Sequence, residues 1–330
     1  MTKNPLRIFD GWDLLLAGLV LITVAYGVAL VPNFLTAFNL SQLTAGVAEK
    51  ALLVLPMVFL IIAREIDLSV SSILALTSVA LGLLLQAGAP LPLAIAATLA
   101  VGAGLGAING TLVTYLGLPS LVVSLGTMAL YRGIGYILLG SGSVNTFPDA
   151  LTSFGIDNIP GTQIPWVILP FAVLAPLFAV ALQLMPIGKR IYAIGGNPNA
   201  ARYSGILIGQ VRFWLFVLSG FVCSVAGIVY TARLSNARAN NAVGMELDVI
   251  TIALFGGVSV WGGRGRMTGV FLALILIATL RNLLGLNQIG GDAQGTVIGI
   301  LLIGSLLISN STEFLAARLK TQGTTVKVSG

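Results

Sequence analysis

The sequence predicts an all-α, polytopic integral membrane protein with about ten transmembrane helices, some of them short or broken. Of its 330 residues, 57% are hydrophobic and only 8% are charged, whereas a soluble globular domain carries about 25% charged residues. The mean hydropathy of +1.00 likewise indicates a membrane protein. Apolar runs of about 20 residues, the length that crosses the hydrocarbon core of a bilayer, recur along the whole chain. We therefore expect a single transmembrane domain over residues 1–330.

The residues that most enzymes need are scarce. The chain has no histidine, which is the commonest general base and metal ligand. Its single cysteine, Cys223, excludes an intrachain disulfide, a thiolate metal cluster and a CxxC redox pair. The basic residues are scattered between apolar runs and form no stripe, so the net charge of +6 indicates membrane topology and no nucleic-acid partner. We expect no enzyme activity, no bound metal and no cofactor.

The first predicted span follows Lys3 and Arg7. Its apolar run is longer than the hydrophobic region of a signal peptide and no A-x-A cleavage pattern follows it, so we expect it to be retained. Two later runs are short: one begins directly after a charged cluster, and another opens with Glu246 and Asp248 and ends among glycines. Short or broken segments often line a transport pathway. The ten predicted spans are 12–31, 46–63, 69–87, 91–115, 120–140, 164–185, 212–232, 246–261, 268–286 and 294–310.

The distribution of Lys and Arg predicts the orientation. With ten spans and a cytoplasmic N-terminus, twelve basic residues fall inside and four, Lys50, Arg233, Arg238 and Arg281, fall outside, while Arg132 lies within a span. This bias follows the positive-inside rule. We therefore expect both termini in the cytoplasm, with a polar, disordered tail over 319–330.

The largest predicted inner loop, 186–211, contains a short helix. Asn197 is a plausible N-cap with Pro198 at the first helical position, and Gly205 is placed to stop the helix after Ser204. Its exposed Arg and Tyr side chains suit either docking into a partner's groove or lying on the membrane surface. The chain has no GxxxxGK[ST] motif to cradle phosphates. If ATP drives transport, the ATPase is another subunit.

A charged segment, Arg64-Glu65-Ile66-Asp67-Leu68-Ser69, separates two apolar runs. A charge in hydrocarbon costs about 2.5–3.5 kcal/mol on insertion scales, so these side chains belong at the inner interface or in a polar cavity. Asp67 followed by Ser69 predicts a cap for the next helix, and Arg64 is expected to pair with Glu65 or Asp67. Polar residues within other spans face the bundle interior, where they contact a solute or bond neighbouring helices: Asn109, Ser124, Thr127, Arg132, Tyr136 and Gln183.

A glycine-rich segment over 243–266 predicts a broken helix or a re-entrant hinge, in which most of the glycines serve close packing.

Together with the segments above, this glycine-rich segment resembles the permease subunits of ribose-type bacterial ABC sugar importers. The resemblance covers nearly the whole chain in the family's order, and the 188–206 loop is its most specific part. The matching pieces are Ile66-Asp67-Leu68-Ser69-Val70, Ile108-Asn109-Gly110, Ser124-Leu125-Gly126-Thr127-Met128, residues 188–206, Glu246-Leu247-Asp248, Gly256-Gly257 and Gly262-Gly263-Arg264-Gly265.

The resemblance implies a bacterial inner-membrane permease that forms the pathway for a monosaccharide or sugar-like solute. Its partners would be a separate ATPase at the 186–211 loop, a periplasmic sugar-binding protein, a second permease that is identical or related, and membrane lipid. It implies a coupling loop built on Gly188, Arg190, Gly195, Asn197, Ala201, Arg202 and Gly205. Pathway candidates are Asp67, Ser69, Asn109, Thr127, Arg132 and Glu246.

The chain departs from the family where Arg64 and Glu65 replace glycines and where Ser71 replaces another. These departures suggest a subgroup similar to the permeases for rhamnose or autoinducer-2. An alternative function is a stand-alone ion-coupled secondary transporter, which would place carboxylates deep in the membrane. The sequence disfavours it, since all eleven acidic residues fall at or near predicted span ends or in loops.

Overall fold

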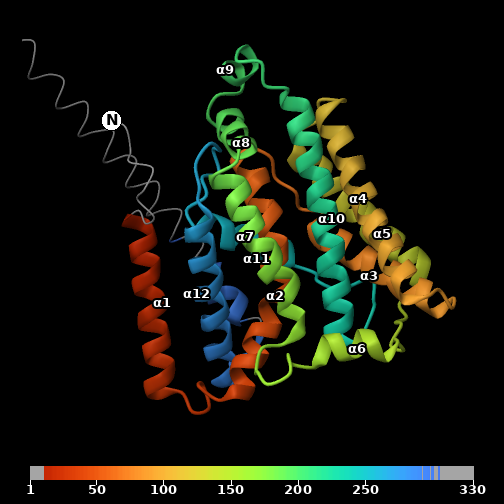
Figure 1. The fold of residues 1–330 in the computed structure, drawn as a ribbon, viewed down its shortest axis with the longest axis vertical. Coiled ribbons are helices and arrows are strands. Elements are labelled where there is room, and N and C mark those ends of the chain that lie inside the picture. The colour runs from red at the N-terminus through yellow and green to blue at the C-terminus, as the bar shows by residue number, and fades with distance from the viewer. Residues whose placement is uncertain (1–10, 292, 298, 301–303, 305–330) are drawn as a thin grey trace, which may run out of the picture.

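A computed structural model describes residues 11–291, 293–297, 299–300 and 304, and within them the all-α fold is confirmed. Seven helices in this part are long and apolar enough to cross a membrane. The bundle is elongated, with its long helices roughly parallel to one axis (Figure 1). The helices are α1 (Gly11–Leu30), α2 (Ala37–Ile62), α3 (Val70–Gln86), α4 (Leu91–Thr114), α5 (Ser120–Leu139), α6 (Asp149–Ile156), the 3-10 helix η1 (Trp166–Ile168), α7 (Leu169–Gln183), α8 (Pro186–Gly196), α9 (Pro198–Tyr203), α10 (Ile208–Leu234), α11 (Met245–Phe255) and α12 (Met267–Leu286).

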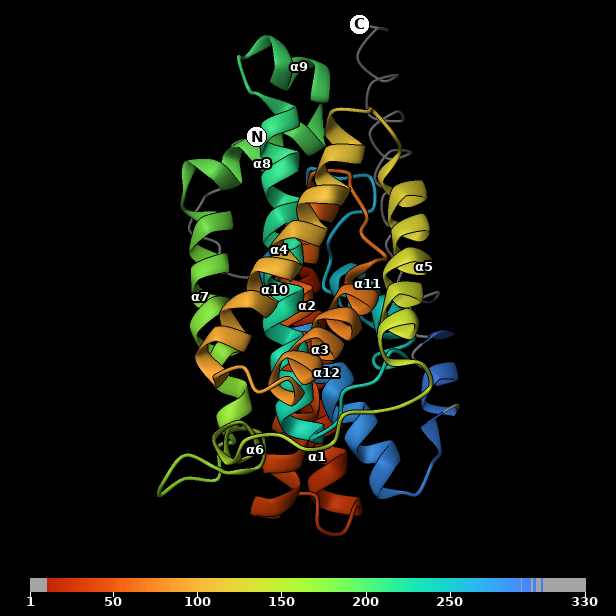
Figure 2. The same cartoon turned by 90° about the vertical axis from the view of Figure 1, so that its right-hand side faces the viewer.

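The two ends of the bundle differ. Helices α8 and α9 project from one end, called here the α8–α9 end, while the α1–α2 loop and α6 lie at the other (Figures 1 and 2). The predicted spans agree with α1, α3, α4, α5, η1 with α7, α10 and α12 to within a few residues. Most of the predicted span 294–310 and all of the tail 319–330 lie outside the described residues.

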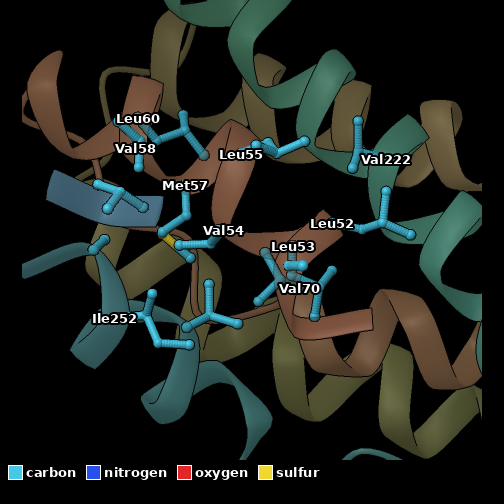
Figure 3. Packing of buried hydrophobic residues seen from close by; sticks show 14 of the residues in the cluster. Leu52, Leu53, Val54, Leu55, Met57, Val58, Leu60, Val70, Val222 and Ile252 are labelled. Atoms are coloured by element: carbon cyan, nitrogen blue, oxygen red, sulfur yellow. The ribbon is translucent and has the colours of Figure 1, made fainter. Parts of the chain in front are cut away.

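Helix α2 forms the centre of the molecule. Its second half is apolar on every side, and a helix of this kind is buried among others. Residues 51–62 are all buried, and they pack mainly against α10, α11 and α7. Val222 of α10, Ile252 of α11 and Val70, the first residue of α3, belong to the same hydrophobic cluster (Figure 3).

Helix α2 begins nine residues before the predicted start of its span, which is a correction. The Thr36 hydroxyl accepts a hydrogen bond from the Asn39 backbone amide at 3.3 Å, so the helix starts at Ala37. Its first turns carry polar side chains that a hydropathy criterion rejects. As a consequence Glu49 and Lys50 lie in the middle of the helix and not near its outer end.

Glycines hold α4 and α10 together. Gly102, Gly106 and Gly110 follow one another at four-residue spacing on α4, so they share a face. A Cβ at Gly106 would lie 2.2 Å from the carbonyl oxygen of Phe216, and one at Gly220 would lie 2.1 Å from that of Gly102. The two backbones touch, which is the usual helix packing where lipid removes the hydrophobic drive for association.

The predicted break in the segment 243–266 is present, but its helix, α11, ends at Phe255 and not at the predicted end of the span, residue 261. Helix α11 has 11 residues, a length of about 16 Å at 1.5 Å per residue, or about half of the hydrocarbon core. The glycine-rich residues after it form turns, with positive φ at Gly257, Gly262 and Gly263. The loop over 141–163 contains a helix that the sequence did not reveal, α6. It packs on α10, and a Cβ at Gly155 would lie 1.9 Å from the carbonyl oxygen of Ala232.

Candidate functional site

The segment α8–α9 has the local structure that its sequence predicts. The Asn197 side chain caps α9 by accepting a hydrogen bond from the Ala200 amide at 3.1 Å. Gly205 follows the helix with φ of +80°, a conformation that favours glycine. Ala201 is buried with Ile194 and Ile208, which fixes α9 against the rest of the segment. The sequence did not reveal α8, in which Gly195 and Gly196 form the last turn.

The outer surface of this segment is cationic. Lys189, Arg190 and Arg202 are exposed, and the Tyr203 side chain is 93% exposed. The sequence contains no acidic residue between Asp157 and Glu246, so no carboxylate of this segment offsets the positive charge. A surface of this kind suits a partner that offers an acidic groove.

The inner side of α8 touches the end of α2 and the glycine turn after α11. A Cβ at Gly195 would lie 1.7 Å from the carbonyl oxygen of Ile62, and that same oxygen accepts a hydrogen bond from the Gly263 amide at 2.8 Å. The Tyr192 hydroxyl donates to the carbonyl of Gly265 at 2.7 Å. Burial raises the pKa of Tyr192, so the hydroxyl keeps the proton that this bond needs. Helix α8 is equally close to α7, since a Cβ at Gly188 would lie 1.9 Å from the carbonyl oxygen of Leu182.

The prediction that Arg64 pairs with Glu65 or Asp67 is wrong. Its Nε donates to the carbonyl of Gly195 at 2.7 Å and its Nη2 donates to that of Gly196 at 3.1 Å. Glu65 forms an ion pair with Arg212 of α10 at 2.8 Å. The two charges therefore join the α2–α3 connector, residues 63–69, to different helices instead of neutralising each other.

Asp67 lies at the centre of a buried polar network. Its Oδ1 accepts hydrogen bonds from the Ser69 amide at 3.0 Å and the Ser69 hydroxyl at 2.6 Å, and its Oδ2 accepts one from the Ser219 hydroxyl at 3.2 Å. The predicted cap is thus wrong in detail. Ser69 is the N-cap residue of α3, and its hydroxyl donates to Asp67 instead of accepting from an amide of the first helical turn.

The network continues across two more helices. Asn109 of α4 donates to the Ser69 hydroxyl oxygen at 2.8 Å, and the Tyr131 hydroxyl of α5 donates to Asn109 Oδ1 at 3.0 Å. All of these polar groups are buried. The Asp67 network, defined as Asp67, Ser69, Asn109, Tyr131 and Ser219, therefore fixes the start of α3 to α4, α5 and α10.

The network lies deep in the bundle. Ser219 is eleven residues into α10, a distance of about 16 Å from the start of that helix at the α8–α9 end. Asp67 does lie in a loop, the α2–α3 connector, but this loop is buried within the bundle and does not lie at a membrane surface. The expectation that all acidic residues lie at or near span ends or in loops is wrong for Glu49, which is buried in the middle of α2 and pairs with Arg233 at 2.7 Å. Asp248 similarly pairs with Lys50 at 2.8 Å and Arg281 at 2.6 Å.

The other pathway candidates lie outside this network. The Thr127 hydroxyl donates to the Val123 carbonyl of its own helix at 3.0 Å. Arg132 donates to the carbonyls of Ala239 at 2.7 Å and Asn241 at 2.5 Å, and so braces the α10–α11 loop. Glu246 lies in the first turn of α11, where the helix dipole favours a carboxylate.

Tyr131 and Ser219 were missed by sequence reasoning. Tyr131 had a usable signal, because it follows Ser124 and Thr127 at seven- and four-residue spacing on one helix face. Ser219 offered no signal in the sequence other than being a small polar residue in an apolar helix. Within the described residues, no three His, Cys, Asp or Glu side chains gather as a metal site.

The comparison with protein families decides the class of protein. Residues 39–306 match the family described as "Branched-chain amino acid transport system / permease component". The chain belongs to this permease family. Similar proteins include the D-allose transport system permease protein AlsC of Escherichia coli K12, 35% identical with 93% of this chain and 94% of the relative covered.

Two further relatives have similar sequence identities to this chain. The ribose import permease protein RbsC of Haemophilus influenzae is 31% identical over 88% of this chain and 91% of its own. The autoinducer 2 import system permease protein LsrD of Escherichia coli K12 is 30% identical over 95% and 98%. No solved structure matches the chain.

The resemblance to ABC importer permeases is thereby confirmed. The protein is a multi-pass inner-membrane permease of an ABC importer and not an enzyme. Membership of this family implies a separate ATPase and a substrate-binding protein as partners. Family membership, and not the position of the carboxylates, is what disfavours a stand-alone secondary transporter, because Asp67 and Glu49 are buried within the bundle.

Proposed function

We propose that this permease and a second permease, identical or related, form the pathway for a monosaccharide or sugar-like solute, with the ATPase docked on α8–α9. The observation that carries the proposal is the projecting α8–α9 segment, which is cationic outside and joined to the transmembrane helices inside. A rigid projection of this kind passes a partner's movement to the helices it contacts.

The solute class is supported by the relatives, whose names specify ribose, D-allose and autoinducer 2. The polar groups at the start of α3 agree with this class of solute. Asp67, Ser69 and Asn109 supply carboxylate, hydroxyl and amide groups at the start of α3, and these groups suit the hydroxyls of a sugar. They are buried within one chain, so we assign them to the pathway wall that opens during transport.

Thr127, Arg132 and Glu246 are the remaining pathway candidates in this proposal. Arg132 and Glu246 belong to the part of the wall formed by the α10–α11 loop, since Arg132 bonds the carbonyls of that loop and Glu246 directly follows it. Lipid covers the apolar outer surface, which includes most of α1, with side chains such as Leu21 70% exposed.

The same proposal fixes the orientation. The α8–α9 end carries Lys189, Arg190 and Arg202, and α1 begins on that side of the bundle (Figure 1). By the positive-inside rule this end faces the cytoplasm. We assign both chain termini to the same side, as the distribution of Lys and Arg in the sequence predicts. The binding protein then delivers the solute at the opposite end, where α6 lies.

Co-purification with the ATPase tests the docking site. We expect Arg202→Glu to reduce the amount of ATPase that co-purifies with the tagged permease in mild detergent, because it reverses one charge of the cationic surface. The matched control is Arg238→Glu, an exposed arginine just beyond α10 at the opposite end. Equal ATPase recovery with both variants would contradict docking on α8–α9.

A further inference from the structure

The end of α2 is closed by a turn that puts a residue other than glycine in the left-handed conformation. The Glu65 amide donates to the Leu60 carbonyl at 2.9 Å and the Arg64 amide donates to that of Ile61 at 3.0 Å, a pattern known as the Schellman motif. Glycine usually takes the left-handed position, because a Cβ is unfavourable there. Here Arg64 takes it, with φ of +66°. An unfavourable conformation that persists points to a role for the side chain.

The Arg64 side chain caps the end of α8. Its bonds to the Gly195 and Gly196 carbonyls, at 2.7 and 3.1 Å, reach the last two residues of that helix. Carbonyls at a helix C-terminus lack intrahelical partners and form the negative end of the helix dipole. The guanidinium therefore joins the end of α2 to the end of α8 across 131 positions of sequence.

The same turn leads directly into the Asp67 network. Asp67 follows Arg64 by three residues, and α3 begins at Val70. Between them, the Ile66 amide donates a hydrogen bond to the Ser120 hydroxyl oxygen at 3.2 Å, and Glu65 pairs with Arg212. The connector is thus held along its length, so a displacement of α8 that moves Arg64 also moves the backbone that carries Asp67.

We propose that Arg64 is a positioning residue for transport, which ties the α8–α9 segment to the start of α3. Movement that the ATPase imposes on α8 then reaches the pathway wall through Arg64 and the connector. This inference rests on the proposed function. The backbone bond from the Gly263 amide to Ile62 holds the same turn from another side and does not depend on the Arg64 side chain.

Arg64→Gly tests the proposal, because glycine suits the backbone conformation while it removes both bonds to α8. The matched control is Asn33→Gly, which gives the same backbone relief at φ of +65° in the α1–α2 loop at the opposite end. Each permease is reconstituted with its ATPase and binding protein in vesicles, and labelled-sugar uptake and ATP hydrolysis are measured together. We expect Arg64→Gly to keep hydrolysing ATP while it moves about tenfold less sugar per ATP. Asn33→Gly should match the unaltered complex, and Arg64→Lys, which keeps a cationic donor, should recover part of the loss.

Equal sugar per ATP for Arg64→Gly and Asn33→Gly overturns the proposal. If Arg64→Gly assembles poorly by size-exclusion chromatography, Arg64→Met replaces it, because methionine keeps an apolar stem and loses the donors. Normal coupling in an assembled Arg64→Met complex likewise overturns the proposal. ATP-independent uptake by the unaltered complex would instead show that the proposed function is wrong.

Discussion

At the scale of single residues, Asp67 shows why depth in the membrane is hard to predict. Its neighbours in sequence are Arg64 and Glu65, so it belongs to a charged cluster that hydropathy places at a membrane surface. The connector instead carries it to the level of Ser219, eleven residues into α10. The depth of Asp67 depends on how α3, α4, α5 and α10 pack around its network, and no spacing of residues within the charged segment predicts this packing.

Asn197 and Gly205 are the opposite case. The N-cap, the helix start at Pro198 and the left-handed stop at Gly205 are local properties of six to nine residues, and the sequence predicted them correctly. The bonds of Arg64 were predicted wrongly, because its partners lie 131 and 132 positions away.

The Asp67 network gives the first stability prediction. Asp67→Ala leaves the Ser69 amide, the Ser69 hydroxyl and the Ser219 hydroxyl without their buried acceptor. We expect it to lower the stability of the permease by about 2 kcal/mol or more. Asp67→Asn is the control, since it keeps an acceptor oxygen and the Ser219 hydroxyl can turn to accept from the new amide. Thermal unfolding in detergent compares them, and identical transition temperatures would contradict the structural role of the network.

At the scale of elements, the existence of a span was easier to predict than its ends. The short segments α3 and α11 were recognised from their flanking charges and glycines. The early start of α2 was missed, because the turns that follow its N-cap residue, Thr36, carry polar side chains and do not look like part of an apolar span. Helix α6 was missed because its eight residues are too few to show a period.

The α4–α10 contact supports a prediction with an internal control. Gly106→Ala would put a Cβ 2.2 Å from the Phe216 carbonyl oxygen, and two helix backbones cannot easily separate there. We expect a large loss of folded, monodisperse permease in size-exclusion chromatography. Gly104→Ala, two residues away in open space, should fold as well as the unaltered chain or better, since alanine favours a helix by about 1 kcal/mol over glycine. Similar yields from both variants would show that this contact does not hold the helices together.

At the scale of the whole molecule, a series of contacts joins the proposed docking segment to the Asp67 network. The cationic α8–α9 segment contacts the end of α2 through Gly195 and Arg64, and the connector continues to the Asp67 network at the start of α3. The fold class and the family were accessible from composition and motifs. This series of contacts was not, because each of its steps is a contact between segments far apart in sequence.

Transport by purified components tests the central claim most directly. Vesicles containing the permease, with and without its ATPase, receive labelled ribose, D-allose or autoinducer 2 together with the binding protein. We predict uptake of a sugar or sugar-like solute only when the ATPase and hydrolysable ATP are both present. Uptake by the permease alone, driven by a proton or sodium gradient and unaffected by ATP, would contradict this account.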